Sequence, residues 1–251
     1  MAGLPRAQGE FIFDRVTEVV TSAGAHPAKS GCHPNLYIVV TNEPVEILTA
    51  WYKRDRRMFD KPMPAVVKHF FSRPLPVRIW YNTQLSGENG EAGSNQGNIG
   101  GAGGQMGASA EMNTGGQTNS NGQASMLADL PTFQEVPGGS RLRMAAAHDL
   151  ASVIVIVDFK QMEGLNWGQL ADYIAMAALT NVDLDHNFSD VPSILALFNT
   201  AVESRPHGLS DWDRAYLKAL YHTERMSRLQ RVSIALEIAR EMDPSKRSAN
   251  P

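Results

Sequence analysis

Residues 166–179 (NWGQLADYIAMAAL) constrain the fold more than any other segment, because they form a helical pattern that is apolar on nearly every side. A continuously apolar, β-branched run at 152–159 (SVIVIVDF) precedes them and predicts the central strand of a sheet. A helix this apolar has to be buried on several sides. Only Gln169 and Asp172 interrupt its apolar surface, and their spacing makes them neighbours. We therefore expect a buried central helix packed on a sheet.

The other patterns predict a mixed arrangement of strands and helices. Turn chemistry at 31–35 leads into a short buried strand at 36–40, and a helix follows with Asn42 as N-cap and Pro44 in its first turn. Further strands are expected at 77–85 and 141–147, and further helices at 13–23, 191–198, 209–222 and 227–242. The expected fold class is α+β: a small mixed sheet of about four strands, a buried central helix and a C-terminal helical layer.

Several terminal and facial features of these helices follow from residue spacing. Ser210 with Asp213, and Ser227 with Gln230, have the spacing of capping boxes. Three apolar stripes are expected to be buried: Phe13, Val16, Val20 and Ala23 in the first helix; Trp212, Ala215, Tyr216, Ala219 and Leu220 in the helix at 209–222; and Leu229, Val232, Leu236 and Ala239 in the last helix.

Residues 86–126 differ abruptly from the rest of the chain, being rich in Gly, Asn, Ser, Gln and Ala. More than half of the 21 glycines lie there. Such a segment buries too little apolar surface to offset its ordering entropy, so it predicts a disordered insertion, with order resuming near 127–136. Because strands are expected on both sides of it, the insertion decorates one α+β domain spanning 11–242.

Charge and composition exclude some classes of protein. The formal net charge is −3, so no overall basic field favours nucleic acid. No apolar run reaches the roughly 20 residues of a membrane-spanning helix. The single Cys32 completes neither a disulfide nor a CxxC motif. The first ten residues lack the apolar region of a signal peptide, which leaves two compartments open: cytoplasmic, or periplasmic or exported if an upstream signal peptide was removed.

Asp172 and Gln169 are the polar groups whose role most affects the functional interpretation. A buried carboxylate such as Asp172 more often accepts hydrogen bonds from a backbone amide or an arginine than it takes part in catalysis. A ligand or proton-transfer site would need a second titratable group nearby. His148, beside Asp149 between two expected strands, and Asp158 are the candidates. A hydrolase site would then combine Asp172, Gln169, His148 and Asp158.

The runs 153–179 (containing GQLADY), 191–199 (VPSILALFN) and 208–221 (GLSDWDRAYLKALY), together with the closing helix, resemble a group of uncharacterised bacterial proteins, many of them exported. The resemblance spans roughly 32–242 without the Gly-rich segment. More distantly, the order of elements resembles zincin-like metallopeptidases, whose central helix carries HExxH. At the matching positions this chain has Gly168, Gln169 and Asp172. Since glycine offers no ligand atom and glutamine cannot act as a base, the resemblance implies a degenerate relative without a metal site.

A second surface candidate is basic. Between 53 and 78 there are eight Lys or Arg against two Asp, with aromatic residues interleaved. Lys53, Arg54, Arg56 and Arg57 form its densest part and could dock an anionic envelope component or an acidic protein. The alternative is a solvated basic face whose aromatic residues turn to the core.

No complete catalytic motif is present, and the Gly-rich run at 100–104 lacks the residues of a phosphate loop. We therefore expect a non-catalytic binding or scaffold protein with no metal and no cofactor, with the hydrolase around Asp172 and His148 as the alternative.

Overall fold

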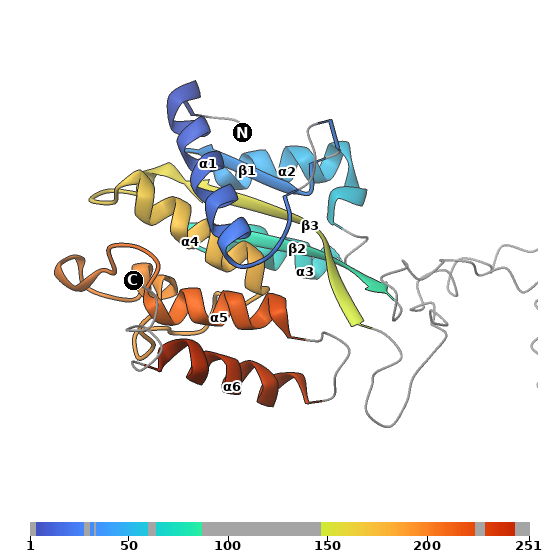
Figure 1. Ribbon diagram of the computed structural model, residues 1–251. Coiled ribbons are helices and arrows are strands. Elements are labelled where there is room, and N and C mark those ends of the chain that lie inside the picture. Colours follow the sequence, from blue (N-terminus) through green and yellow to red (C-terminus); the bar gives the residue numbers. More distant parts are fainter. Residues whose placement is uncertain are drawn as a thin grey trace, which may run out of the picture.

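The computed structural model describes residues 4–27, 31–32, 34–59, 64–86, 147–223 and 229–243. Within these ranges the chain is an α+β protein with six α-helices and a three-stranded mixed sheet, as expected from the sequence (Figure 1). The expected insertion at 86–126 and the segment 127–136 lie outside the described residues, apart from Ser86.

The sheet has the strand order β1-β3-β2. β1 (Leu36–Thr41) pairs in parallel with the central strand β3 (Ala147–Asp158), and β2 (Val77–Ser86) pairs with β3 in antiparallel fashion. The described part of the expected strands at 141–147 and 152–159 is one continuous strand, because the ladder with β2 extends to Ala147. Residues 141–146 lie outside the described ranges. The continuously apolar run of β3 fits its central place, since both of its faces are covered.

Side chains alternate between the two faces of the sheet and build two cores. Val153, Val155 and Val157 of β3 point towards α1 (Arg6–Ser22) and α4 (Trp167–Thr180). Ile154 and Ile156 point the other way, into a smaller aromatic core. That core is shared with α2 (Pro44–Arg54) and α3 (Pro64–Ser72). The result is three layers, with the sheet in the middle.

The central helix α4 is buried from Gln169 to Ala178 without interruption. Asn166 caps its first turn, and its last turn ends at Asn181, which adopts a left-handed conformation with φ of 49°. It contacts both the helix α1 and the sheet. The expectation of a buried central helix is therefore confirmed.

A C-terminal layer formed by α5 (Asp211–His222) and α6 (Gln230–Met242) packs beyond α4 (Figure 1). The capping box of Ser210 and Asp213 is present. Asp213 is fully buried and also accepts hydrogen bonds from the Ser193 hydroxyl and the Ile194 amide, so one carboxylate joins α5 to the preceding segment. The box expected at Ser227 falls on a residue outside the described ranges.

Parts of the predicted helical pattern are wrong. The helix expected at 13–23 begins at Arg6, and it buries Ile12, Val16, Val19 and Ala23 while Phe13 is 61% exposed. The next helix is preceded by Glu43 as its N-cap instead of Asn42, with no side-chain cap. The segment expected as a helix at 191–198 forms a 3₁₀ turn, Ile194–Phe198. Helix α3 was not expected at all, although Pro64 is typical of a first helical turn.

The last two helices also differ from expectation in the faces they bury. In α5, Asp213, Ala215, Leu217 and Ala219 are buried, whereas Trp212 and Tyr216 stack on each other at 5.2 Å and stay partly exposed. In α6 the stripe expected to be buried faces outwards, and no residue of this helix is fully buried. α6 contacts α5 and lies at the outside of the molecule, so only its opposite face is covered (Figure 1).

None of the helices in the described ranges is long and apolar enough to cross a membrane.

Candidate functional site

Asp172 points from α4 towards α1 and the segment before α5, with 3% of the residue exposed. Arg15 Nε donates to its Oδ1 at 2.7 Å, and Arg15 Nη2 donates to its Oδ2 at 3.2 Å. The backbone N–H of Leu209 donates to Oδ2 at 2.9 Å. The hydrogen bond to Asp172, with a smaller contribution from Glu18, raises the pKa of Arg15 above its already high ordinary value. The partners of this carboxylate are thus an arginine and a backbone amide, as expected for an aspartate with a structural role.

Gln169 likewise has a structural role. Its backbone N–H donates to the Asn166 side chain at 2.9 Å, and its Oε1 accepts from the Asn166 backbone N–H at 3.1 Å, which completes a capping box. Its Nε2 donates to the carbonyl of Pro206 at 2.9 Å. Both the side-chain oxygen and the side-chain nitrogen of this buried glutamine are therefore hydrogen-bonded within the fold.

Together these two side chains attach residues 206–209 to the central helix. Gly208 lies so close to Asp172 that a Cβ at this position would come within 2.7 Å of Oδ2. A larger residue there would displace the carboxylate that holds the amide of Leu209. Position 208 therefore requires glycine, because the Asp172 carboxylate lies too close to admit a Cβ.

The other two candidates lie at opposite ends of β3. Asp158 ends the strand and caps the following turn, accepting from the Lys160 backbone N–H at 3.2 Å and from Gln161 Nε2 at 2.8 Å. His148 lies ten residues before Asp158 in the same strand, where it pairs with Leu85 of β2. The side chain of His148 lies outside the described part. Ten residues of strand span about 33 Å. The strand therefore separates His148 from Asp158 and does not bring them to one site.

The basic segment is divided between different environments. Lys53 and Arg54 are exposed at the end of α2, and Arg56 is exposed just after it. The Arg56 guanidinium lies 5.2 Å from the centre of the Tyr52 ring. Arg73 forms an ion pair with Asp185, and Arg78 is buried. The side chain of Arg57 lies outside the described part. The positive charge that remains exposed is thus smaller than the sequence count implies.

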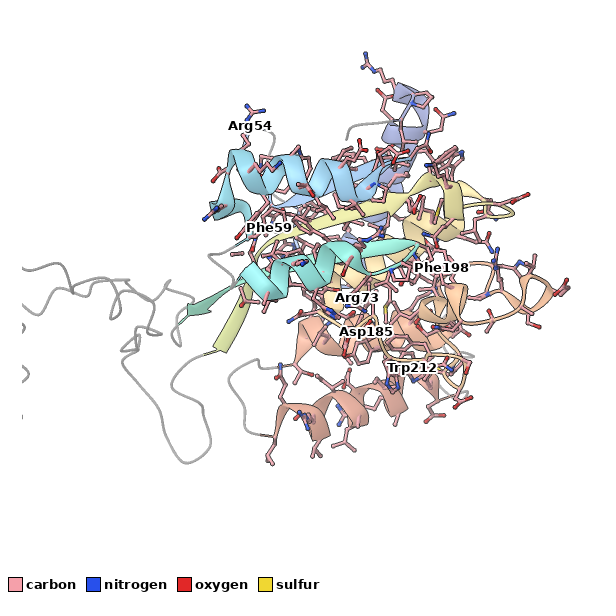
Figure 2. All side chains as sticks on the ribbon, turned by 180° about the vertical axis from the view of Figure 1, so that it is seen from behind. Arg54, Phe59, Arg73, Asp185, Phe198 and Trp212 are labelled. Carbon is pink, nitrogen blue, oxygen red and sulfur yellow. The ribbon has the colours of Figure 1, made fainter. Side chains whose placement is uncertain are left out.

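The aromatic residues of this segment mainly face inwards. Phe59, Phe70 and Phe71 are buried in the core shared with α2 and α3, where their rings meet edge to face or tilted. Figure 2 shows Phe59 directed into this layer while Arg54 points away from it. This arrangement agrees with a solvated basic face whose aromatic residues support the core.

The sequence did not single out a groove along the free edge of β2. The N–H of Asp158 donates to the carbonyl of Pro76, so this pair of residues is hydrogen-bonded across the ladder. Because hydrogen-bonded and open pairs alternate in antiparallel strands, the backbone groups of Val77, Ile79 and Tyr81 point away from β3. No other described strand or backbone group pairs with them. Among the described residues, the backbone donors and acceptors at every second position of this edge therefore have no backbone partner.

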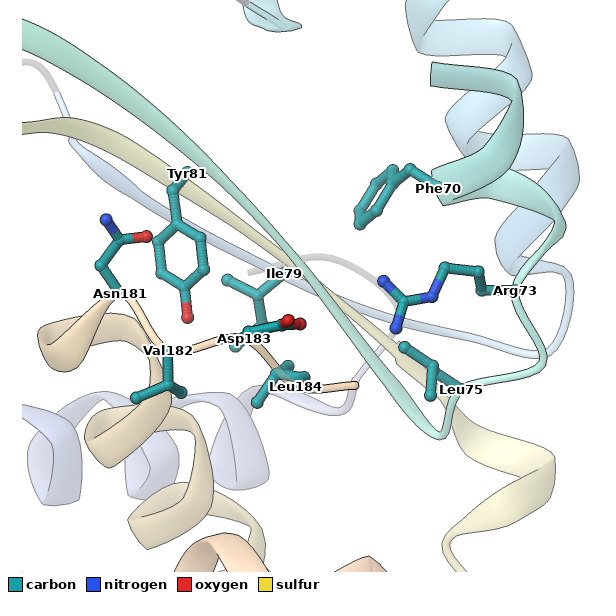
Figure 3. A pocket seen from close by; sticks show the side chains of 9 residues that line it. All are labelled: Phe70, Arg73, Leu75, Ile79, Tyr81, Asn181, Val182, Asp183 and Leu184. Carbon is teal, nitrogen blue, oxygen red and sulfur yellow. The ribbon is translucent and has the colours of Figure 1, made fainter. Parts of the chain in front are cut away.

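A pocket of about 290 Å³ lies against this edge. Ile79 and Tyr81 line it from β2. Phe70, Arg73 and Leu75 line it on one side, and the segment after α4, residues 181–184, lines it on the other (Figure 3). Its exposed walls are about evenly polar and apolar, with Arg73 and Asp183 as the charged groups. Mixed walls beside unpaired strand backbone suit an extended peptide, which has both a polar main chain and side chains to place.

Two contacts fix the shape of the groove. Arg78, buried on the opposite face of β2, donates from Nη2 to the carbonyl of Arg73 at 2.5 Å and so holds the segment that leads into the strand. Tyr81 donates its hydroxyl proton to the carbonyl of Ala177 at 2.7 Å, which ties β2 to α4. Burial raises the pKa of Tyr81 well above its ordinary value, so its hydroxyl stays protonated as a donor.

One sequence signal does mark the beginning of this strand. Pro74 and Pro76 immediately precede β2, and proline is typical of the start of a strand because it cannot donate a ladder hydrogen bond. The sequence does not indicate that residues 181–184 form the other wall.

In the part of the chain that the structure describes, no three His, Cys, Asp or Glu side chains converge as ligands of a metal ion would. The three α4 positions compared above with HExxH carry Gly168, the capping Gln169 and the arginine-paired Asp172.

Comparison of the chain with protein-family models, with curated proteins and with solved structures finds no match.

Proposed function

We propose that this chain is a non-catalytic binding protein that takes an extended peptide along the free edge of β2. The observation that carries the proposal is the row of outward backbone groups at Val77, Ile79 and Tyr81, the last two of which line a pocket. A peptide strand that pairs with this edge gains main-chain hydrogen bonds, and alternate side chains enter the flanking walls. The function of the fold is then to hold the groove in shape.

The recessed edge limits what can bind there. Val77 and Ile79 are only 2% and 8% exposed, backbone included, so pairing with a peptide requires the walls beside the strand to open. A single extended chain fits between such walls more readily than the surface of a folded domain. The pocket volume lies near the lower limit for small-ligand sites, which suits a short segment of peptide.

The state of the α4 side chains supports a non-catalytic role. A general acid or base has to reach substrate within hydrogen-bond distance. Asp172 is sealed between Arg15 and the Leu209 amide, and Gln169 is used in the cap. These observations do not favour the hydrolase alternative, because His148 and Asp158 lie far apart along one strand and Asp172 and Gln169 are buried. Its test is direct, because substitution Asp172→Asn should abolish hydrolysis if such an activity exists.

Selection from a phage-displayed library of random decapeptides tests peptide binding. The wild-type protein should enrich specific clones, and these should be lost with Leu184→Asp, which places a charge in the groove wall. Leu165→Asp is the matched control, since Leu165 is a half-buried leucine that packs on the same core outside the groove. Failure to enrich clones, or clones that bind both variants equally, would contradict the proposal.

Hydrogen exchange then locates the bound peptide. In the free protein the amides of Ile79 and Tyr81 should exchange faster than that of Trp80, whose N–H lies in the ladder with β3. An enriched peptide should protect Ile79 and Tyr81 specifically. Protection elsewhere, with these two amides unchanged, would place the ligand on another surface.

A second candidate partner is an anionic envelope component at Lys53, Arg54 and Arg56. Their exposed position at the C-terminal end of α2 favours it. Binding to phosphatidylglycerol vesicles should fall with salt and with the double substitution Lys53→Glu, Arg54→Glu. Retention of binding by the double variant would exclude this surface.

A further inference from the structure

The outer face of α6 is more apolar than the face it buries. Leu229, Val232 and Leu236 are 61%, 56% and 59% exposed, and Ala235 and Ala239 are exposed beside them. These five residues, here called the α6 stripe, recur at the three- and four-residue spacing of a helix–helix seam. An exposed apolar stripe of this regularity is typical of a contact surface.

The covered face of α6 is mixed in character. Ile234 and Ile238 are half-buried there, together with Glu237 and Glu241. Lys218 of α5 donates to both carboxylate oxygens of Glu241 at 2.9 Å, so part of the contact between the two helices is ionic. The helix therefore has enough attachment to α5 to be held in place, while its apolar stripe remains available.

The positions of the large and small residues along the α6 stripe make it self-complementary in one antiparallel arrangement. If two copies of α6 lie antiparallel about an axis between Ala235 and Leu236, Leu236 meets Ala235 of the partner subunit. Val232 then meets Ala239 of the partner subunit. Facing positions that alternate large and small side chains interdigitate well. A parallel arrangement would instead set each leucine against its own copy.

We propose that the chain self-associates through this antiparallel contact between two α6 helices, forming a two-fold symmetric dimer. Such an isologous contact closes on itself, as in most homodimers. The proposal concerns a surface that shares no residue with the β2 groove, and it does not depend on peptide binding.

The area of the contact sets its strength. α6 has 13 residues and is about 20 Å long. The α6 stripe offers on the order of 400 Å² of apolar surface per copy, so two copies bury about 800 Å². Stable interfaces bury roughly 1,200 Å² or more, and this contact therefore belongs to the weak, reversible class. We therefore expect dimers to form only at micromolar to millimolar chain concentrations, as weak and transient contacts of this size do.

Sedimentation equilibrium of the full chain between about 10 µM and 1 mM tests this range. The buffer has to be reducing, because Cys32 is exposed and could link two copies covalently. Wild type should rise from monomer towards dimer mass. Leu236→Glu should weaken association at least about tenfold. Val45→Glu is the matched control on α2, where the valine is 45% exposed, and it should associate like wild type.

Ala235→Leu separates the proposed geometry from general stickiness. It adds apolar surface, so non-specific adhesion would become stronger. In the antiparallel contact the new leucine would clash with Leu236 of the partner subunit, and association should become weaker. Circular dichroism establishes that each variant is folded. A monomer at 1 mM, equal association of Leu236→Glu and Val45→Glu, or tighter association of Ala235→Leu would each overturn the proposal.

Discussion

The ion pair between Asp172 and Arg15 should stabilise the fold by connecting three segments, and its strength can be worked out from the contacts. The carboxylate accepts two hydrogen bonds from the guanidinium and one from the Leu209 amide. Substitution Asp172→Ala leaves a buried N–H without an acceptor, which costs about 1–3 kcal/mol. It also leaves the guanidinium without its main counter-charge.

Partial exposure of Arg15 reduces the second contribution. Its side chain is 26% exposed and keeps its contact with Glu18, so water and Glu18 stabilise part of the charge. We therefore expect Asp172→Ala to lower the free energy of unfolding by about 3 kcal/mol, at the lower limit for breaking a buried pair. Asp172→Asn keeps the shape and one acceptor oxygen, and about 2 kcal/mol is expected.

A double-mutant cycle measured by urea unfolding isolates the pair. Arg15→Met, Asp172→Asn and the double variant should give a coupling energy of about 1–2 kcal/mol. Glu18→Gln is the control, because Glu18 is 66% exposed and its loss should cost under about 0.5 kcal/mol. A coupling energy near zero would refute the argument, since Asp172 would then be stabilised by the Leu209 amide alone.

Three further perturbations probe the same architecture. Gly208→Ala should destabilise by about 1–3 kcal/mol, because its Cβ would displace the carboxylate of Asp172. Wild-type stability in this variant would mean that the segment can shift freely. Asp213→Ala should cost about 3 kcal/mol or more by thermal or urea unfolding, since this buried carboxylate serves three donors, and a cost below about 1 kcal/mol would contradict that role. Burial raises the pKa of Tyr81 and Tyr173, so their stabilisation is complete below their unfolded pKa near 10 and is lost as pH rises towards their folded values. Urea unfolding from about pH 9 to 11 should show this decline, and it should shrink when both are replaced by phenylalanine; an unchanged slope would refute the assignment.

The sequence predicts the centre of this fold better than its periphery. β3 and α4 are identified because both are apolar on nearly every side, and only burial on several sides explains such patterns. The α6 stripe shows the limit of the same reasoning. Its periodicity correctly predicts a helix, but periodicity does not say which surface will cover the apolar face.

The candidate site divides in a similar way. That Asp172 would find an arginine or an amide follows from the cost of burying an unpaired charge, although nothing in the chain identifies Arg15, 157 residues away, as the partner. The β2 groove could not be predicted, because its walls come from α3 and from residues 181–184 and meet only after the layers have packed. The separation of His148 and Asp158 follows directly from finding both in one strand.

The strand order β1-β3-β2 also governs when the sheet can form. β1 and β2 do not touch each other, and both have to wait for β3, whose residues lie 117 positions after their β1 partners and 61 to 80 after their β2 partners. Long-range pairing of this kind makes folding slow. During synthesis at about 5–20 residues per second, the N-terminal strands therefore remain without their neighbour for several seconds. The nascent chain is most in need of protection from aggregation before Ala147–Asp158 leaves the ribosome.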